Sequence, residues 1–229
     1  MTYSLGIDVG TTFTAAAIMQ AGRVETFQLG TQRAAIPSVV AFRADDSILV
    51  GEAAERRAAA EPDRIAREFK RRFGDPTPMM ISGVPRSPES ITARLLRHVV
   101  DAVERQQGAP PDRVVVTHPA AWNDFRLGVL RQALQIARLD GATLAAEPVA
   151  AAVHYASSRE IESGARLAVY DFGGGTFDVA IAEKTSDGFE LVGEPVGIDR
   201  LGGIDLDVAL LHLVDAGVAG ALAALDPFD

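Results

Sequence analysis

The sequence predicts an α/β fold with a mixed sheet and flanking helices, and three observations lead to this prediction. Short apolar strands and amphipathic helices follow one another along the chain. The first strands are separated by tight turns, which makes neighbours antiparallel, whereas later strands are separated by helices, which makes them parallel. A glycine-rich turn with the same apolar and acidic neighbours occurs twice, within 6–14 and 168–178. The repeat predicts two similar half-domains, the second beginning near Arg166.

The first elements follow from local signals. Apolar runs bounded by turns such as Gln20-Ala21-Gly22 predict strands at 3–9, 14–19, 23–29 and 37–42. An Ala/Glu/Arg-rich pattern predicts a helix over 51–61. Pro62 suits the first position of a second helix, which is expected to run to about Arg72. The Gly- and Pro-rich residues 73–87 predict a loop or a short hairpin.

The later elements are signalled in the same way. Ser87 and Pro88 predict the capped start of a helix that ends near Gly108. Strands are expected at 113–117, 144–146, 166–171, 177–183 and 189–196. Helices are expected at 123–138, at 148–156 and from about 202–203 onward. Their inward positions are expected to include Leu127, Leu130, Leu134 and Ala137, and, in the last helix, Val208, Leu211, Leu213 and Val214.

The composition excludes several function classes. The 229 residues are 48% hydrophobic, which is enough to bury a core, and the net charge of −9 argues against a nucleic-acid partner. The absence of cysteine excludes disulfides, thiolate zinc sites and cysteine nucleophiles. No signal peptide and no apolar run of membrane-spanning length is evident, so a cytoplasmic protein without a membrane partner is expected.

Both glycine-rich turns have the chemistry of a phosphate site. In the first, Gly10 lets backbone amides approach an anion closely, and Thr11 and Thr12 add hydroxyl donors. Asp8 repels phosphate but can hold Mg²⁺, directly or through water, and the metal then bridges to phosphate oxygens. The second turn repeats these parts, with a second carboxylate before it: Asp171, Gly173, Gly174, Gly175, Thr176 and, just beyond, Asp178.

Each turn taken alone is compatible with an ordinary hairpin. The matched pair favours a site in which one polyphosphate is bound from two sides. Lys70 taken alone is compatible with a surface lysine, and Glu147 with an acid at a helix start. Other phosphate motifs are absent, because no glycine precedes a lysine as in a Walker loop and no G-x-G-x-x-G or G-x-S-x-G occurs.

Six stretches, in one fixed order, carry a family resemblance. They are Gly6-Ile7-Asp8-Val9-Gly10-Thr11-Thr12, Lys70-Arg71-Arg72-Phe73-Gly74, Pro119-Ala120-Ala121-Trp122-Asn123-Asp124, Glu147-Pro148-Val149-Ala150-Ala151-Ala152, Asp171-Phe172-Gly173-Gly174-Gly175-Thr176-Phe177-Asp178-Val179 and Leu201-Gly202-Gly203. Together they resemble the nucleotide-binding domain of the seventy-kilodalton heat-shock chaperones, the DnaK-type family. The resemblance implies an actin-like, ribonuclease-H-like fold built on a five-stranded type of sheet.

The resemblance also implies roles for individual residues. The residues matching catalytic positions are Lys70, Glu147, Asp171, Thr176 and Asp178. Those matching nucleotide-contacting positions are Gly10, Thr11, Thr12, Phe13, Gly173, Gly174, Gly175, Thr176, Gly202 and Gly203. Those matching metal-binding positions are Asp8, Glu147 and Asp171. The implied cofactors are ATP or ADP with Mg²⁺, and K⁺ is a further candidate.

Several positions depart from the family pattern. Ala146 replaces an Asn, and Leu127 replaces an arginine associated with the relay proline Pro119, with Arg126 one residue early. Thr143 replaces a basic residue used in J-domain docking, which leaves a J-domain partner in doubt. A nucleotide-exchange factor and unfolded-protein clients, reached through absent domains, are the other implied partners.

The family domain is longer than this chain. Residues 1–165 are expected to form a first lobe with an inserted subdomain at about 37–110, and 166–229 the start of an incomplete second lobe. An incomplete second lobe leaves apolar faces of its sheet and helix uncovered. Dimerisation or domain swapping through residues 166–217 is expected to cover them.

The function expected is that of an ATP-binding, slowly hydrolysing chaperone domain whose parent is a Mg²⁺-dependent ATPase. Whether this portion hydrolyses ATP by itself stays open. The alternatives are a nucleotide-sensing module without catalysis, an actin-like filament protein and a small-molecule kinase.

Overall fold

The computed structural model describes residues 2–218, and its largest sheet is the mixed sheet that the sequence predicts. Its strands run in the order β11-β10-β1-β2-β3, with a short β4 also paired to β2. β1 is parallel to β10 and β10 to β11, whereas the β1–β2 and β2–β3 pairs are antiparallel. The strands are β1 (Ser4–Val9), β2 (Phe13–Gln20), β3 (Arg23–Phe27), β4 (Ile36–Pro37), β10 (Arg113–His118) and β11 (Thr143–Ala146).

Two helices provide most of the core against this sheet. α2 (Pro88–Gln107) begins as predicted, with the Ser87 hydroxyl accepting a hydrogen bond from the Ser90 amide. Its apolar face is fully buried and is formed by Ile91, Leu95, Leu96, Val99, Val100 and Val103. α3 (Asp124–Ile136) is capped by Asn123 and buries Leu130 and Leu134, while Leu127 is partly buried. The predicted inward positions of α3 are therefore confirmed.

The region between β4 and α2 differs most from the prediction. It holds a small sheet of β5 (Val40–Phe42), β6 (Ile48–Val50) and β7 (Ile65–Ala66), a hairpin of β8 (Met79–Ile81) and β9 (Val84–Arg86), and the one-turn helix α1 (Glu52–Glu55). The predicted helix over 62–72 is wrong. That segment consists of the 3₁₀ turns η1 (Pro62–Arg64) and η2 (Phe69–Arg72) on either side of β7. The reason is non-local, because β7 pairs with Val40 and Ala41 of β5.

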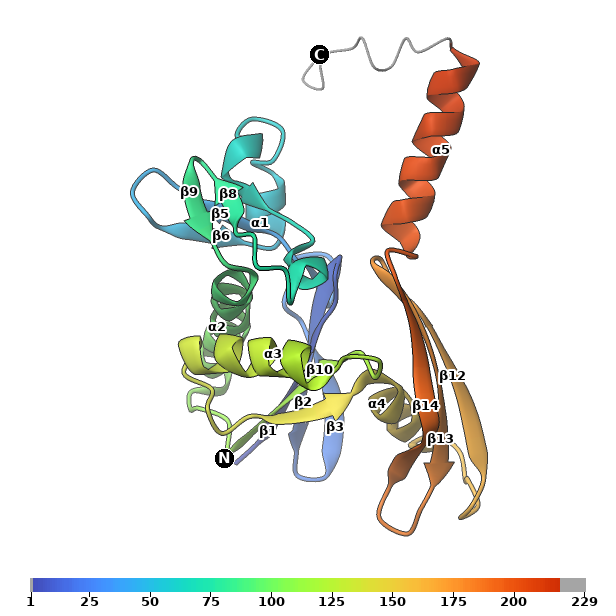
Figure 1. The fold of residues 1–229 in the computed structure, drawn as a ribbon. Coiled ribbons are helices and arrows are strands. Elements are labelled where there is room, and N and C mark those ends of the chain that lie inside the picture. Colours follow the sequence, from blue (N-terminus) through green and yellow to red (C-terminus); the bar gives the residue numbers. More distant parts are fainter. Residues whose placement is uncertain (1, 219–229) are drawn as a thin grey trace.

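A second, antiparallel sheet lies beside the first, with α4 (Glu147–Ala156) between them (Figure 1). It consists of β12 (Arg166–Phe172), β13 (Thr176–Lys184) and β14 (Phe189–Asp199). α4 packs on one face of it through Ala152, next to the buried Ala182 and Phe189. This sheet begins where the sequence pattern restarts.

The last helix, α5 (Gly203–Gly217), extends away from both sheets (Figure 1). The prediction that its apolar residues point inward is wrong, because α5 has no buried residue and Leu213 is 70% exposed. The remaining residues of that prediction are also exposed: Val208, Leu211 and Val214. Residues 219–229 of the predicted second lobe lie outside the described part of the chain. Across residues 2–218, no helix combines the length and hydropathy needed to span a membrane.

Candidate functional site

The two glycine-rich turns have the same local structure. In the β1–β2 turn the Gly10 amide donates to the Phe13 carbonyl at 2.9 Å, and in the β12–β13 turn the Gly173 amide donates to the Thr176 carbonyl at 3.0 Å. Each turn begins with the Gly of an Asp-x-Gly sequence whose first two residues end the preceding strand. The sequence repeat therefore corresponds to a structural repeat.

The two turns also meet in space, although they are far apart in sequence. A Cβ atom added to Gly174 would lie 1.7 Å from the Thr12 hydroxyl, and one added to Gly175 would lie 2.5 Å from the Thr11 hydroxyl. The start of α5 packs on the second turn, where the Gly203 amide donates to the Gly173 carbonyl at 2.9 Å. The absence of side chains at these glycines lets the two turns approach one another closely.

Lys70 and Glu147 form a buried ion pair at this region. Lys70 Nζ donates to Glu147 Oε1 at 2.8 Å, and the two side chains are only 11% and 14% exposed. Lys70 is the second residue of η2, which begins directly after Glu68, and the left-handed backbone of Glu68 (φ 53°) turns the chain after β7. The Lys70 ammonium also lies 5.6 Å from the centre of the Trp122 ring, a distance at which a cation–π attraction acts.

The electrostatics link this pair to the two hairpins. Burial raises the pKa of Glu147 above its usual value, and the neighbouring Lys70 ammonium opposes that shift. The carboxylates of Asp8 and Asp171 raise the pKa of Glu147 further. Glu147 at the start of α4 therefore experiences a charge from each of the two turns.

Asp8 and Asp178, one near each turn, have different surroundings. Asp8 Oδ1 accepts a hydrogen bond from the Thr117 hydroxyl at 2.6 Å, a contact that the sequence analysis missed because it depends on the pairing of β1 with β10. Asp178 lies opposite Asp171 in the β12–β13 register and is 6% exposed, and its buried Oδ2 atom has no hydrogen-bond partner within residues 2–218. Burial raises the pKa of Asp178.

The acidic side chains do not form a metal cage by themselves. Within residues 2–218, no group of three or more His, Cys, Asp or Glu side chains is arranged to hold a metal ion. Mg²⁺ commonly keeps several water ligands and binds through one or two carboxylates together with substrate phosphates. The arrangement fits a metal that arrives with a phosphate ligand.

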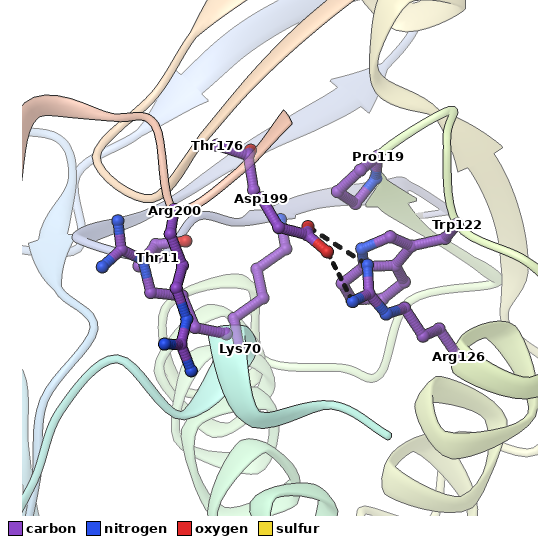
Figure 2. Close-up of a pocket in the computed structure, with 9 residues that line it drawn as sticks. Thr11, Lys70, Pro119, Trp122, Arg126, Thr176, Asp199 and Arg200 are labelled. Carbon is purple, nitrogen blue, oxygen red and sulfur yellow. Dashed lines mark hydrogen bonds and ion pairs between the residues drawn. The ribbon is translucent and has the colours of Figure 1, made fainter. Parts of the chain in front are cut away.

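A cavity of about 250 Å³ opens beside Lys70 (Figure 2). It is lined by Thr11, Lys70, Arg71, Pro119, Trp122, Arg126, Thr176, Asp199 and Arg200. Arg126 bridges from α3 to Asp199 at the end of β14, through two bonds of 3.2 and 2.7 Å. Arg71 bridges from η2 to Asp205 and to the Gly175 carbonyl, the latter at 3.0 Å. Arg71, Asp199 and Arg200 could not be assigned to the site from the sequence, because only the fold brings them to it.

Comparison with known proteins shows the family of this chain. A family model described as Hsp70 protein matches residues 4–86 and 79–218. The chain belongs to the Hsp70 family. Its actin-like fold is therefore the one that the motifs predicted. The chain is 37% identical over 214 residues to a protein named Chaperone protein DnaK from Elusimicrobium minutum, an alignment that covers 91% of this chain. The chain spans about a third of that relative's length (34%). The match to Hsp70 does not favour the filament or kinase alternatives.

Proposed function

We propose that this Hsp70-family chain is an ATP-binding, slowly hydrolysing domain of a chaperone. The observation that carries the proposal is the buried Lys70–Glu147 pair, which lies between two matched glycine-rich turns and within the electrostatic field of Asp8 and Asp171. Phosphoryl transfer depends mainly on positioning and charge stabilisation, and these residues are of the types that provide both.

The turns provide the binding chemistry. The turns at Gly10–Phe13 and Gly173–Thr176 hold the phosphates through backbone amides other than those of Gly10 and Gly173, which are bonded within the turns. Gly202 and Gly203 keep the second turn in place through the contacts of α5. The Thr12 hydroxyl supports this role, because it is buried and has no hydrogen-bond partner in the described chain. Phe13, the last residue of the first turn, is 42% exposed, and its role here is contact with the nucleotide.

Lys70 and Glu147 provide the catalytic chemistry. Lys70 stabilises charge on the terminal phosphate, and its bond to Glu147 fixes where its ammonium lies. The raised pKa of Glu147 makes this carboxylate a stronger base than a surface glutamate, suited to accept a proton from the attacking water. Thr176 and Asp178 orient that water, a role supported by the Asp178 Oδ2 atom, which is buried without a hydrogen-bond partner in the described chain.

Asp8, Asp171 and Glu147 would hold Mg²⁺ through water ligands and the nucleotide phosphates. The metal supplies charge neutralisation for the phosphates when it is bound. Thr117 fixes the rotamer of Asp8, so that this carboxylate is oriented before the ligand arrives. K⁺ is a candidate for a second cation near the same carboxylates.

The partners proposed are those of a chaperone. Nucleotide binds here, whereas unfolded clients and a nucleotide-exchange factor depend on parts of a longer protein. Thr143 at the start of β11 argues against J-domain docking. Self-association through the second sheet is supported by a row of exposed apolar side chains on one face of it, namely Tyr170, Phe172, Val196 and Ile198.

Calorimetric titration of ATP with Mg²⁺ tests the binding proposal. We expect binding by the natural chain and a loss of at least about tenfold in Gly174→Ala, whose new methyl group would collide with Thr12. Gly141→Ala is the matched control, because a Cβ at Gly141 meets nothing within 4 Å. Equal affinities in the two variants, or no heat with the natural chain, would refute the proposed site.

A further inference from the structure

The second sheet has one protected edge and one unprotected edge. Its strand order is β12-β13-β14, so β12 and β14 are the two edge strands (Figure 1). β14 has features that discourage pairing with a further strand, namely Pro195, the acids Glu190 and Glu194, and a register shift against β13. β12 contains no proline, keeps one uninterrupted register with β13 from Arg166 to Phe172, and is uncharged along its centre, Leu167–Tyr170.

The outer edge of β12 carries unpaired backbone groups. Two bonds fix the alternation along this strand: the Lys184 amide donates to the Ala165 carbonyl at 2.9 Å before β12, and the Gly173 amide donates to the Thr176 carbonyl at 3.0 Å after it. Because bonded and non-bonded pairs alternate in an antiparallel ladder, the backbone groups of every second residue point away from β13. These residues are Arg166, Ala168, Tyr170 and Phe172. Within residues 2–218, β12 pairs with β13 alone, so these amides and carbonyls have no strand partner.

Two copies of β12 can satisfy these groups in one another. Val169 is the middle residue of the strand. An antiparallel pairing about a two-fold axis at Val169 places Ala168 opposite Tyr170 of a second copy, and Arg166 opposite Phe172 of that copy. All four residues have outward-facing backbone groups, so each of these pairs can exchange two hydrogen bonds. The two-fold axis repeats every contact, and the pairing uses the whole strand.

The side chains of β12 are complementary to one another in this register. On the face away from α4, Tyr170 is 71% exposed and Phe172 is 51% exposed. The pairing sets the small Ala168 beside the Tyr170 ring, and the Arg166 guanidinium beside the Phe172 ring, where a cation–π attraction acts. On the α4 face it sets Val169 against its own copy, beside a groove of about 420 Å³ between α4 and β12 that Val169 helps to line. A strand of unrelated sequence would share only the backbone bonds.

We propose that β12 is the contact edge of a homodimer, in which the second sheets of two copies join across a two-fold axis into one continuous sheet. The inference rests on the self-association proposed above and assigns it to a strand edge, and it does not depend on nucleotide binding. Main-chain bonds along an exposed edge give affinity, and the side-chain pairs give the register. β12 leads directly into the Gly173–Thr176 turn, so the pairing also holds one strand of that glycine-rich hairpin in each copy.

Sedimentation velocity of the chain without nucleotide tests the edge. The natural chain is expected to sediment as a dimer at about 100 µM, a hundredfold above a micromolar dissociation constant. Ala168→Pro removes one outward-facing amide and leaves the bonds to β13 in place, so it should weaken the dimer at least about tenfold. Ala168→Ser is the matched control, because serine keeps the amide and a small side chain, and it should leave the dissociation constant within about twofold.

Single cysteines test the register, because the natural chain has no cysteine. In the proposed pairing, Val169 lies opposite its own copy with about 4.5 Å between the Cα atoms, a distance that a disulfide can span. Val169→Cys should therefore form a covalent dimer under mild oxidation, seen on non-reducing gels. Ala168→Cys is the control, because Ala168 faces Tyr170 instead of its own copy, and it should give at least about fivefold less covalent dimer. Circular dichroism checks that Ala168→Pro is folded, and the cysteine variants decide the register independently of it.

The outcomes separate this inference from the proposals on which it borders. A dimer that Ala168→Pro weakens and that Val169→Cys cross-links supports the edge. A natural chain that stays monomeric overturns both the edge and the proposed self-association. A dimer that a folded Ala168→Pro tolerates, equal cross-linking of the two cysteine variants, or oligomers larger than a dimer would overturn the two-fold edge alone and leave association through another surface. Calorimetry with ATP and Mg²⁺ tests the nucleotide site separately.

Discussion

Replacing Lys70 by methionine tests the buried ion pair at the centre of the site. The substitution keeps the length and the packing of the side chain against Trp122 but leaves Glu147 as a charge that is only 14% exposed. Removal of one partner from a buried pair costs about 3–5 kcal/mol of unfolding free energy. For a chain of 229 residues, this corresponds to a decrease in Tm of roughly 6–20 °C, measurable by differential scanning calorimetry at pH 8.

The loss of stability caused by Lys70→Met should depend on pH. Burial already raises the pKa of Glu147 in the folded chain, and loss of Lys70, which lowers that pKa, should raise it further. A carboxyl group with a raised folded-state pKa favours folding when protonated and opposes folding when ionised. The destabilisation of Lys70→Met should therefore be largest above the folded-state pKa of Glu147 and should shrink as the pH falls through it.

Two control variants separate the effect of the unpaired Glu147 charge from the other effects of the substitution. Lys184→Met changes the chain's other lysine, which donates to the Thr185 carbonyl, lies 5.4 Å from the centre of the Phe189 ring and makes no ion pair within residues 2–218. It should lower Tm less than Lys70→Met and without the same pH dependence, since it leaves no buried carboxylate unpaired. The double variant Lys70→Met with Glu147→Gln should regain most of the lost stability, since no unpaired charge is left, but should stay at least about 100-fold slower in single-turnover ATP hydrolysis. A double variant as unstable as Lys70→Met would refute the reasoning.

Three further predictions concern neighbouring contacts. Asp178→Asn should raise Tm, more at pH 8 than at pH 5, because burial raises the pKa of Asp178 and so penalises the ionised folded state as the pH rises; an equal gain at both pH values would contradict this. Trp122→Leu should remove a cation–π attraction of about 0.5–2 kcal/mol on the Lys70 ammonium and reduce kcat with little change in ATP affinity. Trp122→Phe keeps an aromatic ring and should retain most of the rate. Equal rates in the two variants would exclude the cation–π contact. Arg71→Ala should speed hydrogen exchange at the Gly173–Gly175 turn, because Arg71 bonds the Gly175 carbonyl; exposed Arg56→Ala should not, and unchanged exchange in Arg71→Ala would count against the bridge.

Much of the fold follows from signals that act over a few residues. The Ser87 and Asn123 caps predict where α2 and α3 begin, and the 3.6-residue apolar period predicts the buried face of α2. The two turns were recognisable as a repeat because hairpin geometry and glycine spacing are properties of a short segment. The candidate site residues on these turns could be named for the same reason.

What the tertiary structure alone decided depends on contacts between distant segments. The Pro62–Arg72 region has a helix-like sequence, but pairing of β7 with β5 makes it a strand between two 3₁₀ turns, and this path carries Lys70 to Glu147. The Arg126–Asp199 bridge likewise joins residues 73 positions apart, which no local pattern can pair. The sequence by itself determined the caps of α2 and α3, the two glycine-rich turns and most strands of the two sheets beside them, because these signals act within a few residues. Only the fold decided which charges meet, since electrostatic partners are selected by the packing of whole elements.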